Sequence, residues 1–361
     1  MRGKLLTSSL LAALCLTLSS LTMATTWYVN GVGGSDSNDC KSPTTACKTI
    51  GHAISLAAAG DTIRVGPAIY TENLAINVNL TLIGARTATT IIDGGGVNIV
   101  VTVSSANAHV NISNVTVRNG SGRPGGGIYN NGILTINQCE VSGNTARGTP
   151  SGGLGGGIHN GGTLTVNNST ITENQVSGVF GAGFGGGIGN SGTVTVNNST
   201  ISGNTSSGWG GGIGNLGGDV SINNSTVAGN KEIYSYGGIA NYSGTITLQN
   251  SITSNNSPGN CYTRTAISSK GYNLSSDTTC NFSSPGDLNN IDPALGPLQN
   301  NGGPTDTMAL TSGSPAIDAG SPNGCTDSKG HLLKKDQRGK PRPDKEDTGG
   351  CDMGAYENQS D

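Results

Sequence analysis

The feature that most constrains this chain is a repeat of 25 to 30 residues in its middle. Each unit reads Gly-Gly-Ile-x-Asn, then an alternating segment, then Asn-Ser-Thr-Ile or a close variant, then a second Asn. The first Asn recurs at Asn130, Asn160, Asn190, Asn215 and Asn241, and the second at Asn144, Asn174, Asn204 and Asn230. Such a fixed period indicates a solenoid in which each unit packs mainly against its neighbours.

Within a unit the apolar residues recur every second position, which is the period of a β-strand. Thr163-Leu164-Thr165-Val166 places Leu and Val on one face and Thr on the other. One unit holds about three short strands at ~3.3 Å per residue, and stacked units lie ~4.8 Å apart. The sequence therefore predicts an all-β fold: a single-stranded, right-handed parallel β-helix with three short strands per coil.

Stacking in register predicts columns of equivalent side chains. The interior columns are expected at Ile128, Ile158, Ile188, Ile213 and Ile239, at Leu134, Leu164, Val194, Val220 and Ile246, and at Ile136, Val166, Val196, Ile222 and Leu248. At the bend that follows, a ladder of side-chain amides is expected at Asn114, Gln138, Asn168, Asn198, Asn224 and Asn250. Amide ladders satisfy backbone groups at a tight corner, so these Asn residues are predicted to be structural.

The ends of the chain differ from the repeat, which divides the chain into four predicted parts. Residues 1–24 have the basic start, apolar stretch and small residues of a signal peptide. Residues 25–97 are predicted to form a cap and the first coils, with a short helix within 47–60 and strands near 61–66 and 79–84. Residues 98–285 carry the repeat, and residues 286–361 form a C-terminal cap. No later stretch is long and apolar enough to span a bilayer.

Cysteine usage fits an oxidising compartment. Pairing of sequence neighbours is the simplest disulfide framework: Cys40 with Cys47, Cys261 with Cys280, and Cys325 with Cys351. Six cysteines nevertheless allow about fifteen connectivities. Cys139 is left over, at a repeat position filled elsewhere by Ser169 and Ser199, and it is interpreted as a small buried residue.

Low charge excludes some classes of partner. Only 11% of residues are charged and the net charge is −3, so the chain lacks the basic footprint that nucleic acids require. Its partners are expected to be polysaccharides or cell-surface components, and the protein is expected to be a monomer.

Several stretches resemble three known families. Asp61-Thr62-Ile63-Arg64-Val65-Gly66, continuing to Leu74, is similar to the opening coil of pectate-lyase-like β-helix proteins. The Gly-Gly-Gly-Ile units with Ile171-Thr172-Glu173-Asn174 resemble polymorphic outer membrane protein repeats. Gly313-Ser314-Pro315-Ala316-Ile317-Asp318-Ala319-Gly320 and Cys351-Asp352-Met353-Gly354-Ala355-Tyr356-Glu357 are similar to the choice-of-anchor Q region of bacterial surface proteins. These resemblances imply a bacterial exported protein, secreted or held at the cell surface or outer membrane, and do not imply one activity.

Catalytic chemistry has little support in the repeat. A lyase on this fold needs a base and a cationic or calcium site, and a glycosidase needs two carboxylates. From residue 98 to 260 the only acids are Glu140, Glu173, Asp219 and Glu232. We therefore assign no catalytic residue, no metal ligand and no cofactor. One alternative remains at Asp36, Asn38 and Asp39, an oxygen-rich loop that fits either calcium or a plain turn.

Aromatic residues near the insertions are the candidate ligand site. Phe184 and Trp209 share one slot of the repeat, and Tyr236 lies one residue off it. Tyr129 and His159 occupy the outward position after the column Ile. Rings on a flat β face can stack on sugars, although the simpler interpretation is that they pack the insertion loops and that His159 is an ordinary surface residue. The favoured function is a non-catalytic, adhesin-like or glycan-contacting surface protein; the alternative is a divergent polysaccharide lyase or glycoside hydrolase.

Overall fold

The structure, a computed structural model, describes residues 23–148, 154–178, 183–234, 237–344 and 350–359. The predicted signal peptide therefore lies almost entirely outside the described residues. Within them, no helix is both long and apolar enough to cross a membrane.

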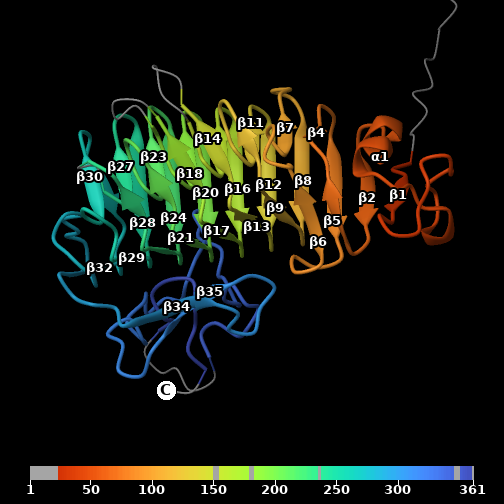
Figure 1. Cartoon of the computed structure of the whole chain (residues 1–361). Coiled ribbons are helices and arrows are strands. Elements are labelled where there is room, and N and C mark those ends of the chain that lie inside the picture. The colour runs from red at the N-terminus through yellow and green to blue at the C-terminus, as the bar shows by residue number, and fades with distance from the viewer. Residues whose placement is uncertain (1–22, 149–153, 179–182, 235–236, 345–349, 360–361) are drawn as a thin grey trace, which may run out of the picture.

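The described chain winds into a parallel β-helix, as predicted (Figure 1). Its consecutive strands fall into three long parallel sheets. Sheet A contains β1 (Thr26–Val29), β2 (Asp61–Val65), β5 (Leu80–Gly84), β8 (His109–Ser113), β12 (Ile133–Asn137), β16 (Thr163–Asn167), β20 (Thr193–Asn197), β24 (Asp219–Asn223), β28 (Thr245–Gln249) and β31 (Ile267–Ser269). Sheet B contains β3 (Ala68–Thr71), β6 (Thr90–Asp93), β9 (Thr116–Arg118), β13 (Glu140–Ser142), β17 (Thr170–Thr172), β21 (Thr200–Ser202), β25 (Thr226–Ala228), β29 (Ile252–Ser254), β32 (Leu274–Ser275) and β33 (Leu288–Asn289).

Sheet C completes each coil, and a short sheet D stands between B and C. Sheet C contains β4 (Leu74–Ala75), β7 (Val101–Val103), β11 (Ile128–Asn130), β15 (Ile158–Asn160), β19 (Ile188–Asn190), β23 (Ile213–Asn215), β27 (Ile239–Asn241) and β30 (Cys261–Thr263). Sheet D contains β10 (Ser121–Gly122), β14 (Thr145–Arg147), β18 (Gln175–Ser177), β22 (Thr205–Ser206) and β26 (Lys231–Glu232). The prediction of three strands per coil missed sheet D, whose strands of two or three residues are too short to have a visible period.

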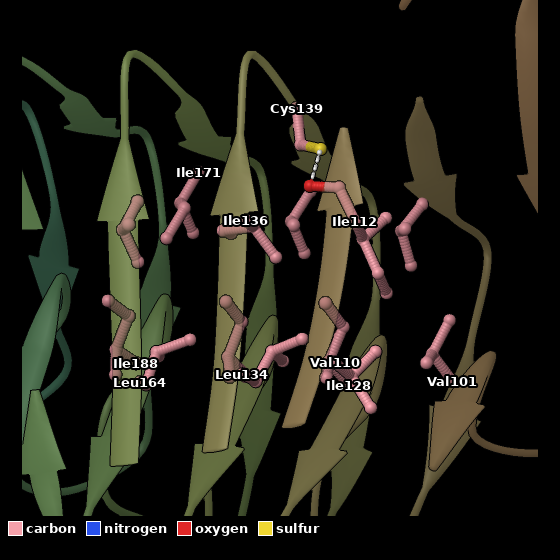
Figure 2. Close-up of a cluster of buried hydrophobic side chains, with 14 of the residues drawn as sticks. Val101, Val110, Ile112, Ile128, Leu134, Ile136, Cys139, Leu164, Ile171 and Ile188 are labelled. Carbon is pink, nitrogen blue, oxygen red and sulfur yellow. Dashed lines mark hydrogen bonds between the residues drawn. The ribbon is translucent and has the colours of Figure 1, made fainter. Parts of the chain in front are cut away.

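The interior columns match the prediction. Ile158 pairs with Ile188 across β15 and β19, and Leu164 pairs with Val194 across β16 and β20. These side chains are almost completely buried. Figure 2 shows one such column in Val110, Leu134 and Leu164, which lie side by side on successive coils. Each is worth about 1.5–3 kcal/mol of burial, so aliphatic residues repeated coil after coil replace the aromatic core of an ordinary domain.

The N-terminal end is closed by a short helix. α1 (Ile50–Leu56) begins at Thr49, whose hydroxyl accepts a hydrogen bond from the His52 amide, and it buries Ile50 and Ala53 against the first coils. It lies within the predicted cap range. The loop before the helix covers the outer edge of β1, where the Tyr28 amide donates to the Cys40 carbonyl and the Cys47 amide donates to the Tyr28 carbonyl, so this edge is not open to another chain. A 3-10 turn, η1 (Pro43–Thr45), precedes it.

All three predicted disulfides are present: Cys40–Cys47, Cys261–Cys280 and Cys325–Cys351. Cys139 is unpaired and buried, and burial raises the pKa of its thiol to about 11. At neutral pH it is therefore an uncharged, small buried residue, as the sequence indicated.

The amide ladders run along different columns from the one predicted. Nδ2 of Asn160 donates to Oδ1 of Asn190 over 2.9 Å, and the same step repeats at Asn130, Asn190 and Asn215. A second ladder passes through Asn144, Asn174, Asn204, Asn230 and Asn256, each step 2.9 Å. Each buried Asn also bonds to backbone groups. These are the two Asn positions that define the period of the repeat in the sequence.

The predicted ladder positions form the corner between sheets A and B. Asn168, Asn198, Asn224 and Asn250 have φ between 46° and 53°, a left-handed conformation that Asn tolerates better than most residues. Among these four, the amide–amide bond is that from Asn250 to Asn224, at 2.9 Å. Nδ2 of Asn168 donates instead to Oδ1 of Asn137, and the Asn198 and Asn224 amides bond to the C-terminal segment, so the predicted ladder is reduced to one step among these four residues.

The C-terminal segment (residues 295–344 and 350–359) lies along this corner and over sheet B, and contains the antiparallel pair β34 (Leu295–Gln299) and β35 (Thr307–Leu310) (Figure 1). Nδ2 of Asn198 donates to the Lys335 carbonyl (2.7 Å), and Nδ2 of Asn224 to the Thr326 carbonyl (2.6 Å). Gln337 is fully buried and bonds to Thr170 and Thr200 on β17 and β21. Because the C-terminal segment covers them, the outward Thr170 and Thr200 of sheet B are buried.

Candidate functional site

The aromatic cluster predicted from the repeat exists, and it lies over the outer face of sheet C. Phe184 forms parallel bridges with Leu154 and Trp209, so the segment before each sheet C strand stacks coil on coil. This segment crosses the outward positions of Gly189 and Gly214, where a Cβ would lie 2.5 Å from a backbone nitrogen. Glycine is therefore required there by close approach of two chain segments. Tyr236 lies outside the described residues.

The rings of this cluster contact one another. Phe184 and Trp209 are stacked at 6.0 Å with 8° between their planes, so one face of each ring is turned to the other. Tyr242 and Tyr262 meet Trp209 edge-on at 4.8 and 5.2 Å, and the Arg264 guanidinium lies 4.5 Å from the Tyr242 ring centre. Mutual packing of aromatic rings is worth about 0.5–1.5 kcal/mol per pair. The geometry favours the packing interpretation of this cluster, with Tyr242 and Tyr262 as members that the slot alignment did not include.

His159 is not the surface residue that its outward slot suggested. It is 7% exposed, stacked on Tyr129 at 5.5 Å, and covered by the segment at Gly125, where a Cβ would lie 3.4 Å from the His159 Cβ. Burial lowers the pKa of His159 to about 4, so the ring is neutral at pH 7. Its Nδ1 has no hydrogen-bond partner among the described residues.

A polar groove, which the sequence analysis missed, runs between sheet A and the C-terminal segment. Two adjoining cavities of about 280 and 260 Å³ share Asn167, Asn197 and Asp327. The first is lined in addition by Asn137, Asn168, Asn198 and Leu333, and the second by Thr165, Thr195, Ser328, Lys329 and His331. We refer to these residues together as the polar groove.

The floor of the polar groove is formed by the last two outward columns of sheet A. Strand alternation turns Leu164 and Val166 inward, so Thr165 and Asn167 face outward and are half-buried. Nδ2 of Asn197 donates to Oδ1 of Asn167 at 3.0 Å, which fixes the orientation of both amides. Because the repeat places the same residue types on every coil, the floor presents amides and hydroxyls at a spacing of ~4.8 Å.

The wall of the polar groove is the turn at residues 327–333. Oδ2 of Asp327 lies 3.1 Å from Nδ1 of His331, and Oδ1 accepts hydrogen bonds from the Lys329 and His331 amides. Burial raises the pKa of Asp327, but these hydrogen bonds and the His331 charge outweigh it and hold that pKa below its usual value. Asp327 is the one carboxylate among the groove-lining residues. The groove therefore offers many donors and acceptors but no pair of acids for hydrolysis.

The side chains of the oxygen-rich loop near the N-terminus form hydrogen bonds within the loop and to neighbouring residues. Oδ1 of Asp36 accepts from the Lys48 and Thr49 amides at 2.9 Å, and Oδ1 of Asp39 accepts from the Thr45 hydroxyl at 2.6 Å. Nδ2 of Asn38 donates to the Ala46 carbonyl. The geometry fits the plain-turn alternative, in which these side chains brace the loop beside Cys40.

Fold and groove together define a parallel β-helix protein with a polar, amide-lined cleft on its flank. It is similar to the crystal structure of a pectate lyase, Pel9A, over 94% of this chain and 98% of that one, at 15% identity and a TM-score of 0.43. It is also similar to pectin methylesterase PemA from Erwinia chrysanthemi over 73% of this chain and 80% of that one, at 13% identity and a TM-score of 0.34. A pectin methylesterase in complex with a hexasaccharide gives 13% identity and a TM-score of 0.35, with 69% of this chain and 78% of that one covered.

No protein-family model and no curated protein matches the sequence. The resemblances to polymorphic outer membrane protein repeats and to the choice-of-anchor Q region therefore gain no support from these comparisons. The structural similarities concern the coiled fold, and no site residue is transferred from them.

Proposed function

We propose that this protein is an exported, non-catalytic polysaccharide-binding β-helix that contacts a neutral glycan through the polar groove. The observation that carries the proposal is the groove floor, where Asn137, Asn167 and Asn197 repeat the same outward amide on successive coils. Sugar hydroxyls both donate and accept hydrogen bonds, and a side-chain amide does the same. A row of oriented amides suits a polyhydroxylated polymer better than it suits a charged one.

Export and surface location are part of the same proposal. Three disulfides are typical of proteins that mature in an oxidising compartment, and the first 24 residues have the features of a signal peptide. We place the protein, as a monomer, outside the cell or at a bacterial cell surface, where an adhesin-like contact with polysaccharide is useful. Retention there through a region similar to choice-of-anchor Q belongs to this proposal.

The experiment compares two Thr residues of one strand. Thr195 lines the polar groove, whereas Thr193, two residues earlier on β20, faces outward outside it. Thr195→Val should weaken binding about tenfold, equivalent to about 1.4 kcal/mol. Thr193→Val should bind like the parent. Affinity is measured by calorimetry against soluble neutral polysaccharides, with polygalacturonate as the acidic comparison.

The outcomes separate cleanly. Equal binding by the two Thr variants would place the contact elsewhere on the molecule. Failure of the parent to bind any neutral polysaccharide would refute the proposal. Melting temperatures of both variants should match the parent, because neither residue belongs to the buried ladders.

A second candidate function is polysaccharide hydrolysis on sheet B, and it is favoured by one observation. Glu140 on β13 is half-buried, and burial together with the charges of Asp306 and Glu173 raises its pKa. Glycoside hydrolysis uses one carboxyl group with a raised pKa together with a second carboxylate. If this function is correct, the protein releases reducing ends from a polysaccharide and Glu140→Gln abolishes the release. Absence of reducing ends across neutral and acidic polymers would remove this candidate.

A further inference from the structure

A second cleft lies near the N-terminal end of the β-helix, on the same sheet as the polar groove. It has a volume of about 330 Å³ and is lined mainly by apolar groups, with Tyr28, Arg64 and Ile83 on its floor and Pro43 and Pro67 at its side. None of the ion pairs of the described residues involves Arg64. We refer to these residues as the N-terminal cleft.

Strand register connects the N-terminal cleft to the polar groove. Tyr28 pairs with Arg64, Arg64 with Ile83, and Ile83 with Ser113 on β8. Ser113 pairs with Asn137, which leads to Asn167 and Asn197. All seven residues therefore occupy one outward column of sheet A. Six steps separate Tyr28 from Asn197, which is about 29 Å at ~4.8 Å per coil.

The two ends of this column differ in chemistry. At the N-terminal cleft, a phenol ring, a guanidinium and aliphatic groups form a surface that can cover the apolar face of a sugar ring, while Arg64 donates to its hydroxyls. In the polar groove, amides and hydroxyls are available for hydrogen bonds along the edge of a chain. Ser113 is half-buried and small, and it adds a hydroxyl between the two.

The C-terminal segment gives the column a side wall over several coils. The Thr305 hydroxyl donates to the Asn168 carbonyl, the Lys335 carbonyl accepts from Asn198, and the Thr326 carbonyl accepts from Asn224. These contacts fall on successive coils at the corner next to the outward column. The wall therefore stands beside the polar-groove end of the column, from β16 to β24, and a ligand lying against it there is oriented parallel to the axis.

We infer that the N-terminal cleft and the polar groove are two ends of one extended site, which holds a single linear, neutral polysaccharide parallel to the β-helix axis. This inference rests on the proposed function and adds its length, direction and second contact point. Stacking at one end and hydrogen bonding at the other make the site selective for long chains.

The test is the dependence of affinity on chain length. Binding of a β-1,4-linked glucose disaccharide and octasaccharide is measured by calorimetry for the parent, for Tyr28→Ala with Arg64→Ala, and for Thr195→Val. The Tyr28/Arg64 variant should weaken octasaccharide binding about tenfold and leave disaccharide binding in the polar groove unchanged. Arg147→Ala, which removes an exposed positive charge from sheet D, should change neither.

Each outcome bears on a different statement. Octasaccharide binding that depends on Thr195 but not on Tyr28 and Arg64 would overturn the extended site and leave the proposed function standing. Tighter binding of a galacturonate oligosaccharide than of the glucose octasaccharide would overturn the neutral ligand. Absence of any binding by the parent would overturn both proposals. Arg64→Gln, a single exposed change, repeats the test if the double variant fails to fold.

Discussion

The repeat region and the C-terminal segment bury polar groups in opposite ways. The repeat buries neutral amides, each bonded to the equivalent amide one coil away and to backbone groups. The C-terminal segment buries ionisable side chains: Asp336, Asp352, Glu357, Arg338 and Arg342 are each exposed by 9% or less. Nε of Arg342 lies 2.6 Å from Glu357, and Nη2 of Arg338 lies 2.7 Å from Asp336.

The difference follows from regularity. In the repeat, each side-chain amide lies opposite an identical amide on the next coil. A ladder of neutral amides can therefore extend over as many coils as the repeat contains. The C-terminal segment has no period, and it must be positioned against the corner residues one contact at a time. Nη1 of Arg342 donates to Oδ1 of Asn198 at 2.9 Å, which ties the charged network directly to the repeat. A buried charge that loses its partner is strongly penalised, so such a network tolerates few alternative arrangements.

The largest effect is expected from Arg342→Ala. It leaves the buried Glu357 carboxyl without its partner and should lower the free energy of unfolding by about 4 kcal/mol. Lys340→Ala, an exposed change in the same turn, should have almost no effect. Urea unfolding followed by tryptophan fluorescence measures both. A loss below about 1 kcal/mol for Arg342→Ala would mean that the charges contribute little to docking of the segment.

A somewhat smaller loss is expected from Asn174→Ala in the repeat. Asn174 accepts from the Asn144 amide and side chain and donates to the Val141 carbonyl, so its removal leaves several buried groups without partners. We expect a loss of about 3 kcal/mol, against almost none for the adjacent, exposed Gln175→Ala. Equal stability of these two variants would show that water replaces the amide, contrary to a dry ladder.

Ile188→Val removes one methyl group from an interior column. It should lower the free energy of unfolding by about 1 kcal/mol, measured by urea unfolding. Thr193→Val on the adjacent outward face serves as its control and should remain within about 0.5 kcal/mol of the parent. A loss above about 3 kcal/mol for Ile188→Val would mean that like-on-like stacking is more rigid than ordinary core packing.

A pH dependence is also expected, and it is confined to the C-terminal segment. Burial and the nearby Asp352 outweigh the Arg342 charge and raise the pKa of Glu357 from 4.5 to about 8. The folded state therefore retains a proton that the unfolded state releases above pH 4.5, and this contribution to stability declines as pH rises towards 8. We therefore expect Tm to fall as pH is raised over this range. Glu357→Gln should flatten that slope, and an unchanged slope would assign it to other groups.

The sequence was sufficient for the coils because every strand is repeated. The alternation at Thr163–Val166 and the recurrence of the Ile128 position determine both the strand period and the register. The ladder was assigned to the wrong columns because Asn occurs at several positions per unit, and spacing alone does not indicate which face each one occupies. In the pair Asn167-Asn168, the first residue faces the groove and the second turns the corner.

The candidate site was harder to predict because half of it is not repeated. The floor of the polar groove was implicit in the recurring Asn pairs, which could have revealed it. Its wall comes from Asp327 and His331, more than a hundred residues away from Asn197 in sequence. Likewise, His159 was misplaced because the segment that covers it, at Gly125, comes from the preceding coil.

Docking of the C-terminal segment also makes the β-helix a structure of defined length. Asn168, Asn198, Asn224 and Asn250 each bond to a different part of that segment. Removing one whole coil between them would leave every strand with a matching neighbour. It would, however, place a different corner residue opposite each of the C-terminal groups to which these four residues bond. The C-terminal segment, which forms the wall of the polar groove, therefore fits a β-helix of one length. It tolerates substitutions within a coil but not a change in the number of coils.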